Sequence, residues 1–252
     1  MKAWFIKPPL WLLLTLLAVL VWFRLHDLSP ARQSPRFTSD IPDFSQYQDI
    51  VEKKKAFFGF LRPLVDAANA RILADRQRLK RLLSEDHVSR AEQHWMQNLA
   101  ADYDVAWPLD DDGRTMLLRR VDMLPPELVL AQAANESAWG TSRFAIRGNN
   151  FFGQWCYVKG CGLVPRARDD GASHEVARFS SPQASVRSYI HNINTNGAYL
   201  ELRLIRAKAR LQGEKPQAKQ LVQGLDRYSE RGQAYVDELL QMIRHNRRYM
   251  QG

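Results

Sequence analysis

The stretch from Leu128 to Trp139 constrains this chain most, because it is almost entirely small or apolar and yet contains one carboxylate, Glu136. A helix of this composition must be buried on nearly all sides. Pro125 and Pro126 suit the entry of such a helix, where a missing N–H costs nothing. Gly140 can end it in the left-handed conformation. The sequence therefore predicts a buried helix with Glu136 in its last turn.

Glu136 is the first candidate for chemistry. Burial and the partial negative charge of a helix C-terminus both disfavour ionisation, so both raise the pKa of this carboxyl group. A carboxylic acid that keeps its proton near neutral pH is what a general acid in glycosidic cleavage requires. The alternative is a partly exposed glutamate at a helix end, paired with Arg143 or Arg147.

The residues around Glu136 resemble a known enzyme family. The run AQAANESAWGTS at residues 131–142 is followed by GNNFFG at residues 148–153. This combination is similar to the peptidoglycan-cleaving glucosaminidases of glycoside hydrolase family 73, which carry E-S-x-W-G followed by N-x-F-G. Within that family the chain resembles the bacterial Bax-type membrane-anchored proteins, and the resemblance covers about residues 110 to 250.

The resemblance implies a fold and an activity. The expected fold is α+β and mainly helical, a lysozyme-like fold with a small β-lobe, preceded by N-terminal helices and a membrane anchor. The expected activity is cleavage of β-1,4 bonds after N-acetylglucosamine in cell-wall glycan, with Glu136 as general acid and without a cofactor. Two alternatives stay open: a lytic transglycosylase that uses the same acid, and a non-catalytic module that binds peptidoglycan or an envelope partner.

The first 27 residues have the pattern of a signal anchor. Lys2 and Lys7 precede an apolar run at residues 10–23, and the region after the run lacks the small residues that a signal peptidase site requires. Because positive charge stays in the cytoplasm, we expect a single-pass inner-membrane protein with its catalytic domain in the periplasm. The expected partners are this membrane and peptidoglycan glycan strands, and no nucleic acid.

Three regions follow the anchor. Residues 28–46 are rich in Pro and Ser and read as a linker. Residues 47–108 carry apolar side chains at helical spacing, with Pro63 expected to kink or divide the first helix and Ser89 to cap a later one, and form a helical accessory region that packs on the core. Residues 109–252 form the glucosaminidase domain, in which one helix is expected to begin with Ser181 as its cap and Pro182 as its first residue. The net charge of +9 suits an anionic wall or membrane nearby.

Residues 154–164 predict a small β-lobe, because they are rich in β-branched and aromatic residues with glycines between them. They also contain the chain's two cysteines, Cys156 and Cys161. In an oxidising compartment a disulfide is the favoured interpretation. Two thiols without a pair of histidines at ligand spacing do not make a zinc site, so we expect no metal.

Glycoside hydrolysis usually requires a second carboxylate, roughly 5 to 10 Å from the first. The resemblance implies an acidic residue in the β-lobe, and Asp169, Glu175 and Asp170 are the candidates, in that order. Asp170 is followed by Gly171 and also suits an ordinary hairpin turn. Alternatively, the N-acetyl group of the substrate replaces this carboxylate, in which case none of the three is essential.

Four further residues are assigned to substrate binding. Trp139 and Phe152 could stack on sugar rings, although Trp139 is equally suited to packing in the core behind Glu136. Asn150 belongs to the N-x-F-G motif. Tyr199 matches an N-x-x-Y pattern that in the family follows a helix, and the resemblance implies that its ring lines the cleft.

Overall fold

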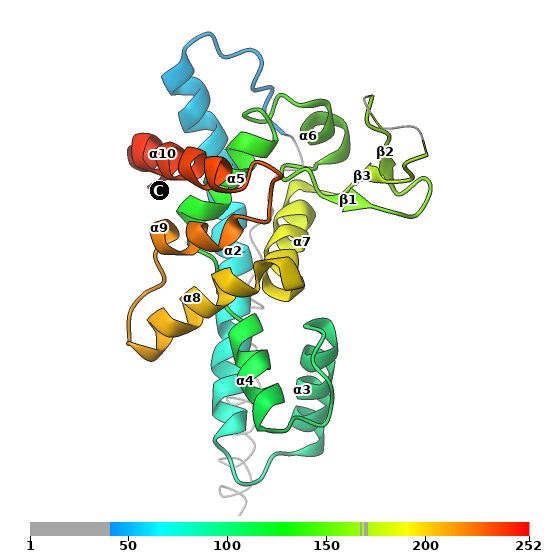
Figure 1. Ribbon diagram of the computed structural model, residues 1–252, viewed down its shortest axis with the longest axis vertical. Helices are drawn as coiled ribbons and strands as arrows, with labels where there is room; N and C mark the ends of the chain where they lie inside the picture. The colour runs from blue at the N-terminus through cyan, green and yellow to red at the C-terminus, as the bar shows by residue number, and fades with distance from the viewer. Residues whose placement is uncertain (1–40, 167, 169–170, 252) are drawn as a thin grey trace, which may run out of the picture. The chain divides into compact units, whose positions relative to one another are not determined.

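The computed structural model describes residues 41–166, 168 and 171–251. They belong to one compact unit, residues 39–252. The predicted anchor and residues 28–40 of the predicted linker lie outside the described residues, as do Asp169 and Asp170. No helix in the described part of the chain is long and apolar enough to cross a membrane. The unit is mainly helical with one small sheet, which confirms the expected α+β class (Figure 1).

The central element is α2 (Ile50–Leu83), a helix of 34 residues whose first turn is capped by the side chain of Asp49. It packs against α5 (Pro126–Glu136), α7 (Pro182–Thr195) and α10 (Gln233–Met250). Its apolar residues follow the expected helical spacing, and nine of its side chains are buried. We expected Pro63 to kink or divide this helix, and the division was wrong, because α2 continues through Pro63 as one element.

The second half of α2 carries its own hydrophobic cluster with α3 (Arg90–Asp102) and α4 (Asp111–Arg120). Leu79 and Leu82 of α2 pack there against residues of the two shorter helices. As the sequence predicts, α3 is capped by Ser89, whose Oγ accepts from the backbone N–H of Glu92 at 3.3 Å. These helices extend the core that α2 shares with α5 (Figure 1).

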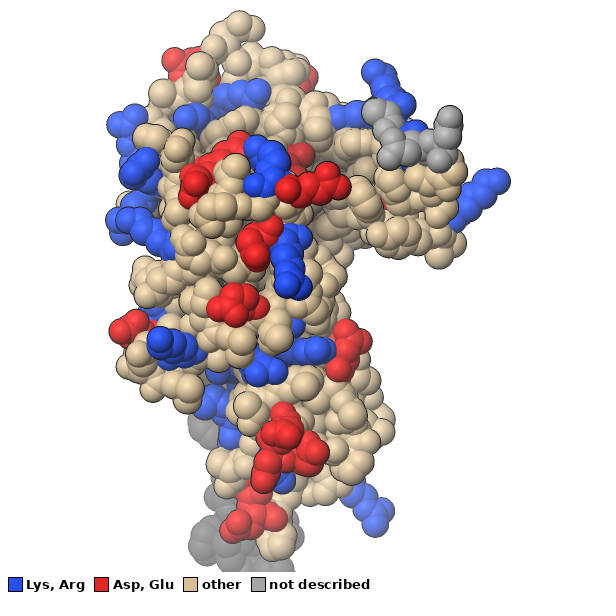
Figure 2. All heavy atoms as spheres, in the orientation of Figure 1, with Lys and Arg blue, Asp and Glu red and all other residues tan. Residues whose placement is uncertain are grey.

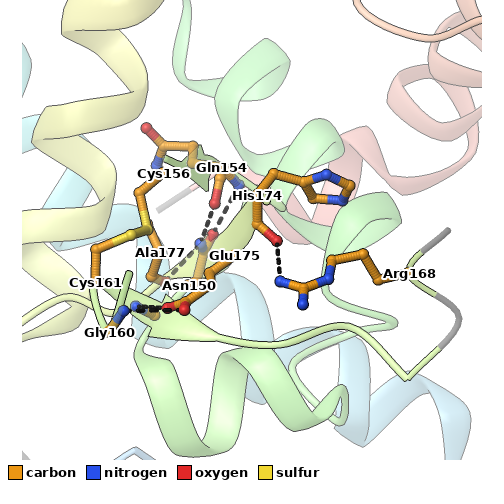
Figure 3. Close-up of a disulfide and its surroundings, with 10 residues drawn as sticks. Asn150, Gln154, Cys156, Gly160, Cys161, Arg168, His174, Glu175 and Ala177 are labelled. Atoms are coloured by element: carbon orange, nitrogen blue, oxygen red, sulfur yellow. Dashed lines mark hydrogen bonds between the residues drawn. A yellow bond between two sulfur atoms is a disulfide. The ribbon is translucent and has the colours of Figure 1, made fainter. Parts of the chain in front are cut away.

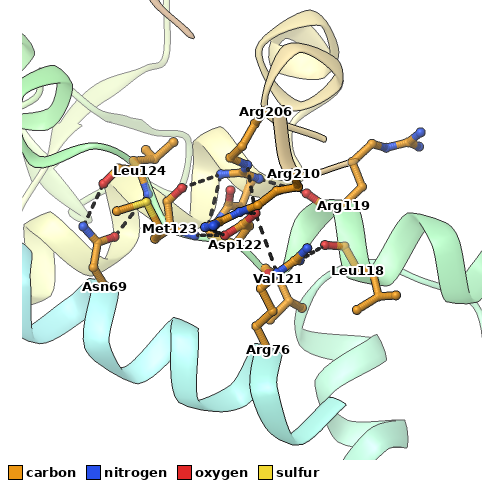
Figure 4. Close-up of polar contacts among 11 residues, drawn as sticks. Asn69, Arg76, Leu118, Arg119, Val121, Asp122, Met123, Leu124, Arg206 and Arg210 are labelled. Carbon is orange, nitrogen blue, oxygen red and sulfur yellow. Dashed lines mark hydrogen bonds and ion pairs between the residues drawn. The ribbon is translucent and has the colours of Figure 1, made fainter. Parts of the chain in front are cut away.

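A buried carboxylate joins α2 to α8 (Leu200–Leu211), as Figure 4 shows. Asp122 is 2% exposed and accepts two hydrogen bonds from Arg210, at 2.8 and 3.0 Å. Arg76 and Arg206 lie 3.8 and 3.9 Å from the same carboxylate. Burial alone would raise the pKa of Asp122, but the three guanidinium groups hold it below its usual value. The segment between α4 and α5 is therefore held by ion pairs.

The β-lobe follows α6 (Arg143–Gly148) and projects from the helices (Figure 1). Its strands are β1 (Trp155–Cys156), β2 (Gly162–Leu163) and β3 (Glu175–Ala177). They form an antiparallel sheet in the order β1-β3-β2, with Trp155 opposite Val176. The predicted disulfide between Cys156 and Cys161 is confirmed and closes the turn between β1 and β2 (Figure 3).

Helix α7 leads from the lobe into the C-terminal helices. Ser181 caps it and Pro182 is its first residue, as the sequence predicts. The 3-10 helix η1 (Gly197–Tyr199) follows directly and leads into α8. After α8 come α9 (Ala218–Leu221), the 3-10 helix η2 (Val222–Leu225) and α10, which packs along α5. One face of α7 also lines the cleft that is described below.

Candidate active site

Glu136 is the last residue of α5, so the helix ends three residues earlier than Gly140 suggested. The next residue, Ser137, donates through Oγ to the carbonyl of Ala133 at 2.6 Å and accepts from the N–H of Gly140 at 2.8 Å. The two residues between Ser137 and Gly140 have φ values of 51° and 59°, and Gly140 has φ 78°. These three successive residues in the left-handed conformation turn the chain away from α5, so Glu136 lies at the C-terminal end of that helix.

The side chain of Glu136 is half-buried and accepts a hydrogen bond from the hydroxyl of Tyr235 at 2.8 Å. Burial raises the pKa of Glu136, and the hydrogen bond from Tyr235 opposes this only in part. Among the described residues Glu136 makes no ion pair, and Arg143 instead donates to the carbonyl of Val164 at 2.6 Å. The surroundings therefore favour the general-acid interpretation over the paired surface glutamate.

Three polar side chains behind Glu136 form one hydrogen-bonded chain. Tyr189 donates to the Oε1 of Gln132, and Nε2 of Gln132 donates to the hydroxyl of Tyr235 at 3.0 Å. Tyr235 in turn donates to Oε1 of Glu136. Because Oε1 accepts this hydrogen bond, Oε2 is the oxygen left to carry a proton when the carboxyl group is protonated. A Cβ built on Gly153 would lie 3.7 Å from this oxygen, so Oε2 faces the end of the N-x-F-G motif.

The side chain of Glu136 lines a cleft of about 650 Å³ that lies between α7, β1 and the loop before α10. The aromatic rings of Trp155 and Tyr157 are 57% and 70% exposed at its β1 side. Trp155 stacks on His174 with ring centroids 4.1 Å apart, which holds its other face toward solvent. Among the described lining residues Glu136 is the one carboxylate. Exposed aromatic faces beside a carboxyl group with a raised pKa suit a sugar chain.

The structure brings two of the four predicted substrate-binding residues to this cleft. Phe152 and Tyr199 both line it, with Phe152 stacked on Tyr189 at 4.0 Å. Trp139 does not line it: its ring packs edge-on against Phe57 and Phe58 of α2, at 5.6 and 5.3 Å. This placement favours the packing role that the sequence left as an alternative.

Asn150 is 1% exposed and serves the backbone. Its amide donates to the carbonyls of Gln154 and Ala177, both at 2.9 Å, and its oxygen accepts from the N–H of Phe152 at 3.2 Å (Figure 3). These bonds join the N-x-F-G turn to β3. Asn150 therefore positions the lobe and does not line the cleft.

Glu175 lies on β3, is 6% exposed and points into the turn between β1 and β2. Its two oxygens accept from the backbone N–H groups of Gly160 and Gly162, at 2.9 and 2.8 Å (Figure 3). These bonds lower the pKa of Glu175. The sulfur atoms of Cys156 and Cys161 lie within 4.8 Å of the carboxylate, but they are bonded to each other and cannot form a metal site with it. Glu175 thus holds the turn instead of facing Glu136.

Sequence reasoning missed the tyrosines around the acid. Tyr228 lines the cleft and donates to the carbonyl of Phe152 at 2.9 Å, and its ring stacks on Tyr235 at 5.5 Å. Burial raises the pKa of both tyrosines, so they remain neutral donors. One signal was present: Gln132 is a polar residue in an apolar helix, four positions before Glu136 and therefore on the same face.

Comparison with known proteins agrees with this geometry. Residues 115–248 match the family described as mannosyl-glycoprotein endo-beta-N-acetylglucosaminidase. The chain is also 34% identical to Protein bax of Escherichia coli strain K12 over 217 residues, which is 84% of this chain and 76% of that protein. No solved structure matches the chain significantly. The match covers Glu136 and every cleft residue, and the chain belongs to the glucosaminidase family of glycosidases.

Proposed function

We propose that this protein is a peptidoglycan hydrolase with a lysozyme-like catalytic domain, which cleaves β-1,4 bonds after N-acetylglucosamine with Glu136 as general acid. The observation that carries this proposal is the state of Glu136 itself. It is half-buried, its pKa is raised, and it is the one carboxylate among the described residues that line the cleft. Family membership supports a glycosidase that acts on glycan of the peptidoglycan type.

In the proposed reaction, the proton on Oε2 of Glu136 passes to the glycosidic oxygen as the bond to the sugar C1 breaks. Tyr235 keeps Oε1 occupied, so the carboxyl group is held in one orientation and with one proton position. A donor held in place by its own hydrogen bond loses little freedom on reaching the transition state. Tyr235 is thus a positioning residue for the acid.

The proposed nucleophile is part of the substrate and not a side chain of the protein. Glu175 already accepts two backbone hydrogen bonds, and no other described residue brings a second carboxylate to the cleft. We infer that the acetamido oxygen of the substrate attacks C1 as the leaving oxygen takes the proton of Glu136. Water then opens the resulting ring at C1 and returns a proton to the Glu136 carboxylate, which completes a retaining hydrolysis.

Purified sacculi test the acid. The Glu136→Gln variant should fold normally and release soluble muropeptides at least about a hundredfold more slowly, because an amide cannot donate the proton. Glu127→Gln is the matched control, since Glu127 lies in the first turn of the same helix and does not line the cleft. Release by Glu136→Gln at the control rate would reject the assignment.

The products separate the alternatives. Fragments with reducing N-acetylglucosamine ends support the proposal, whereas 1,6-anhydro ends would identify a lytic transglycosylase. Binding of both proteins to sacculi without any product would identify a non-catalytic module. Asp169→Asn and Glu175→Gln test the nucleophile: near-normal release by Asp169→Asn supports the substrate's own acetamido group, and a loss as large as that of Glu136→Gln would make Asp169 the second carboxylate.

We further propose that residues 1–27 anchor the protein in the inner membrane with the catalytic domain in the periplasm. The support is the apolar run at residues 10–23 after Lys2 and Lys7, together with a disulfide that suits an oxidising compartment. Membrane fractions extracted with alkaline carbonate test this proposal. An anchored protein stays in the membrane pellet, and a protein recovered in the supernatant would contradict it.

A further inference from the structure

A second cavity of about 320 Å³ adjoins the cleft on the side of the accessory helices. Its walls come from α2, the end of α3 and α7, and Ser188 and His191 of α7 line both it and the cleft. Residues three apart lie on one helix face, so a single face of α7 runs from one cavity into the other. Figure 2 shows the hollow between the projecting β-lobe and the helices below it.

The side chains around this second cavity carry balanced charge. Arg71 and Asp75 come from α2, Asp102 from α3 and Arg187 from α7. Among the described residues none of these four makes an ion pair within 4.0 Å. Asp75 is half-buried, and this burial raises its pKa, while the positive charges of Arg71 and Arg78 oppose the shift in part. Two cations and two anions thus surround the cavity without forming close ion pairs with one another.

Contacts between α7 and the end of α3 form one wall of this cavity. Tyr103 is 5% exposed and lies 5.4 Å from the His191 ring, centroid to centroid. A ring nitrogen of His191 lies 2.6 Å from the carbonyl of Asp102, which joins α7 to the end of α3. The cavity is therefore built between fixed elements and does not depend on a loop.

We propose that this cavity binds the peptide carried by peptidoglycan strands while the sugars of the same strand occupy the cleft beside Glu136. The proposal rests on the function proposed above and names a second part of the substrate. Peptide stems of the wall carry both carboxylate and ammonium groups. The two arginines pair with carboxylates and the two aspartates with an ammonium group, whereas a polyanion would be repelled by Asp75 and Asp102.

Most of the charged residues around this cavity lie outside the part of the chain that matches the family. Arg71, Asp75 and Asp102 precede residue 115, where the match to the family begins. Only Arg187 and the shared face of α7 belong to the matched domain. The accessory helices therefore add a peptide subsite to a glycan-cleaving domain.

Soluble glycan fragments, prepared with their peptides and after removal of the peptides by an amidase, test the subsite. We compare the full-length protein with an Arg71→Glu/Arg187→Glu double variant. The control is Arg90→Glu/Arg114→Glu, because both arginines are exposed, line neither cavity and make no ion pair in the described structure. Circular dichroism confirms that the variants fold.

The wild-type protein should have a KM for peptide-bearing fragments up to about fivefold below that for stripped fragments, since one exposed ion pair contributes up to about that factor. The double variant should lose this preference and keep its kcat/KM on stripped fragments, and the control should behave as wild type. Equal KM values for both fragments in the wild type, or a preference that survives in the double variant, would overturn the subsite.

Cleavage of neither fragment by the wild type would instead reject the proposed function. Binding still decides the subsite in that case. Calorimetry with the Glu136→Gln protein should show tighter binding of the peptide-bearing fragment, and this difference should vanish when Arg71→Glu and Arg187→Glu are added. Equal binding of both fragments would overturn the subsite independently of activity.

Discussion

The hydroxyl of Tyr235 lies 2.8 Å from Oε1 of Glu136, although 99 residues separate the two in the chain. The contact joins the first turn of α10 to the last residue of α5, and these two helices pack along each other. Tyr235 also accepts from Gln132, so its own proton is directed at the carboxyl group. The side chain of the proposed acid is therefore held in place by α10, the C-terminal helix.

Tyr235→Phe should shift the pH profile. A hydrogen bond to the ionised carboxylate lowers the pKa of Glu136, so its removal raises that pKa further. A general acid must be protonated, and the high-pH limb of kcat/KM should therefore move to higher pH, while kcat falls about tenfold through loss of orientation. Tyr249→Phe on the same helix is the control. An alkaline limb that stays in place, or moves to lower pH, would contradict the role of Tyr235.

Gly140→Ala should destabilise the protein. A Cβ at Gly140 would lie 2.3 Å from the ring of Phe44, and the residue has φ 78°. We expect a loss of about 2 to 3 kcal/mol in the free energy of unfolding, measured by urea denaturation. Gly213→Ala is the matched control, since Gly213 has φ 73° with nothing within 4 Å of its Cβ position. Equal losses in the two variants would show that backbone conformation, and not Phe44, sets the cost.

Asp122→Asn should cost about 3 kcal/mol of stability near neutral pH, because it leaves the buried Arg206 without its counter-ion. The folded pKa of Asp122 is below its unfolded value, so its stabilisation is complete above the ordinary aspartate pKa of 3.8 and is lost as pH falls through the lower folded value. The difference between wild type and variant should shrink in that acidic range. Asp66→Asn removes an exposed pair with Arg62 and should cost less than about 1 kcal/mol.

Removing the disulfide should affect substrate binding more than chemistry. The bridge joins residues five apart, so the Cys156→Ser/Cys161→Ser variant should lose only about 2 kcal/mol. Trp155 precedes one of these cysteines and lines the cleft, so KM should rise while kcat stays near the wild-type value. A fall in kcat with unchanged KM would contradict this division. Mass measurement after alkylation, with and without reductant, checks the bridge itself.

Some structural features depend only on residues that are close together in the sequence. Ser89 and Ser181 cap their helices as predicted, because each side chain reaches a backbone N–H only three residues ahead. Cys156 and Cys161 pair because a tight turn joins them. The sequence also predicted the direction of the pKa shift of Glu136, since an apolar helix is buried when the chain folds and burial raises the pKa of a carboxyl group.

Other features depended on contacts between distant segments. Glu136 is the proposed acid and Glu175 is a structural acceptor, and only the direction of each side chain in the folded chain separates these two glutamates. Likewise, Trp139 belongs to the family signature but packs on Phe57 and Phe58. A motif specifies residue types, whereas the packing of other elements decides which surface each residue reaches.

By itself, the sequence determined most of the helices, the disulfide and the family, and it singled out Glu136 as the candidate acid, because each of these rests on spacing or composition within a short segment. The tertiary structure decided what surrounds the acid. It brought Tyr189 and Tyr235 to Gln132 and Glu136, and it placed α2 and α3 beside α7 to form a second cavity. The physical reason is that side-chain direction is set by packing between helices, and that packing joins residues a hundred or so positions apart.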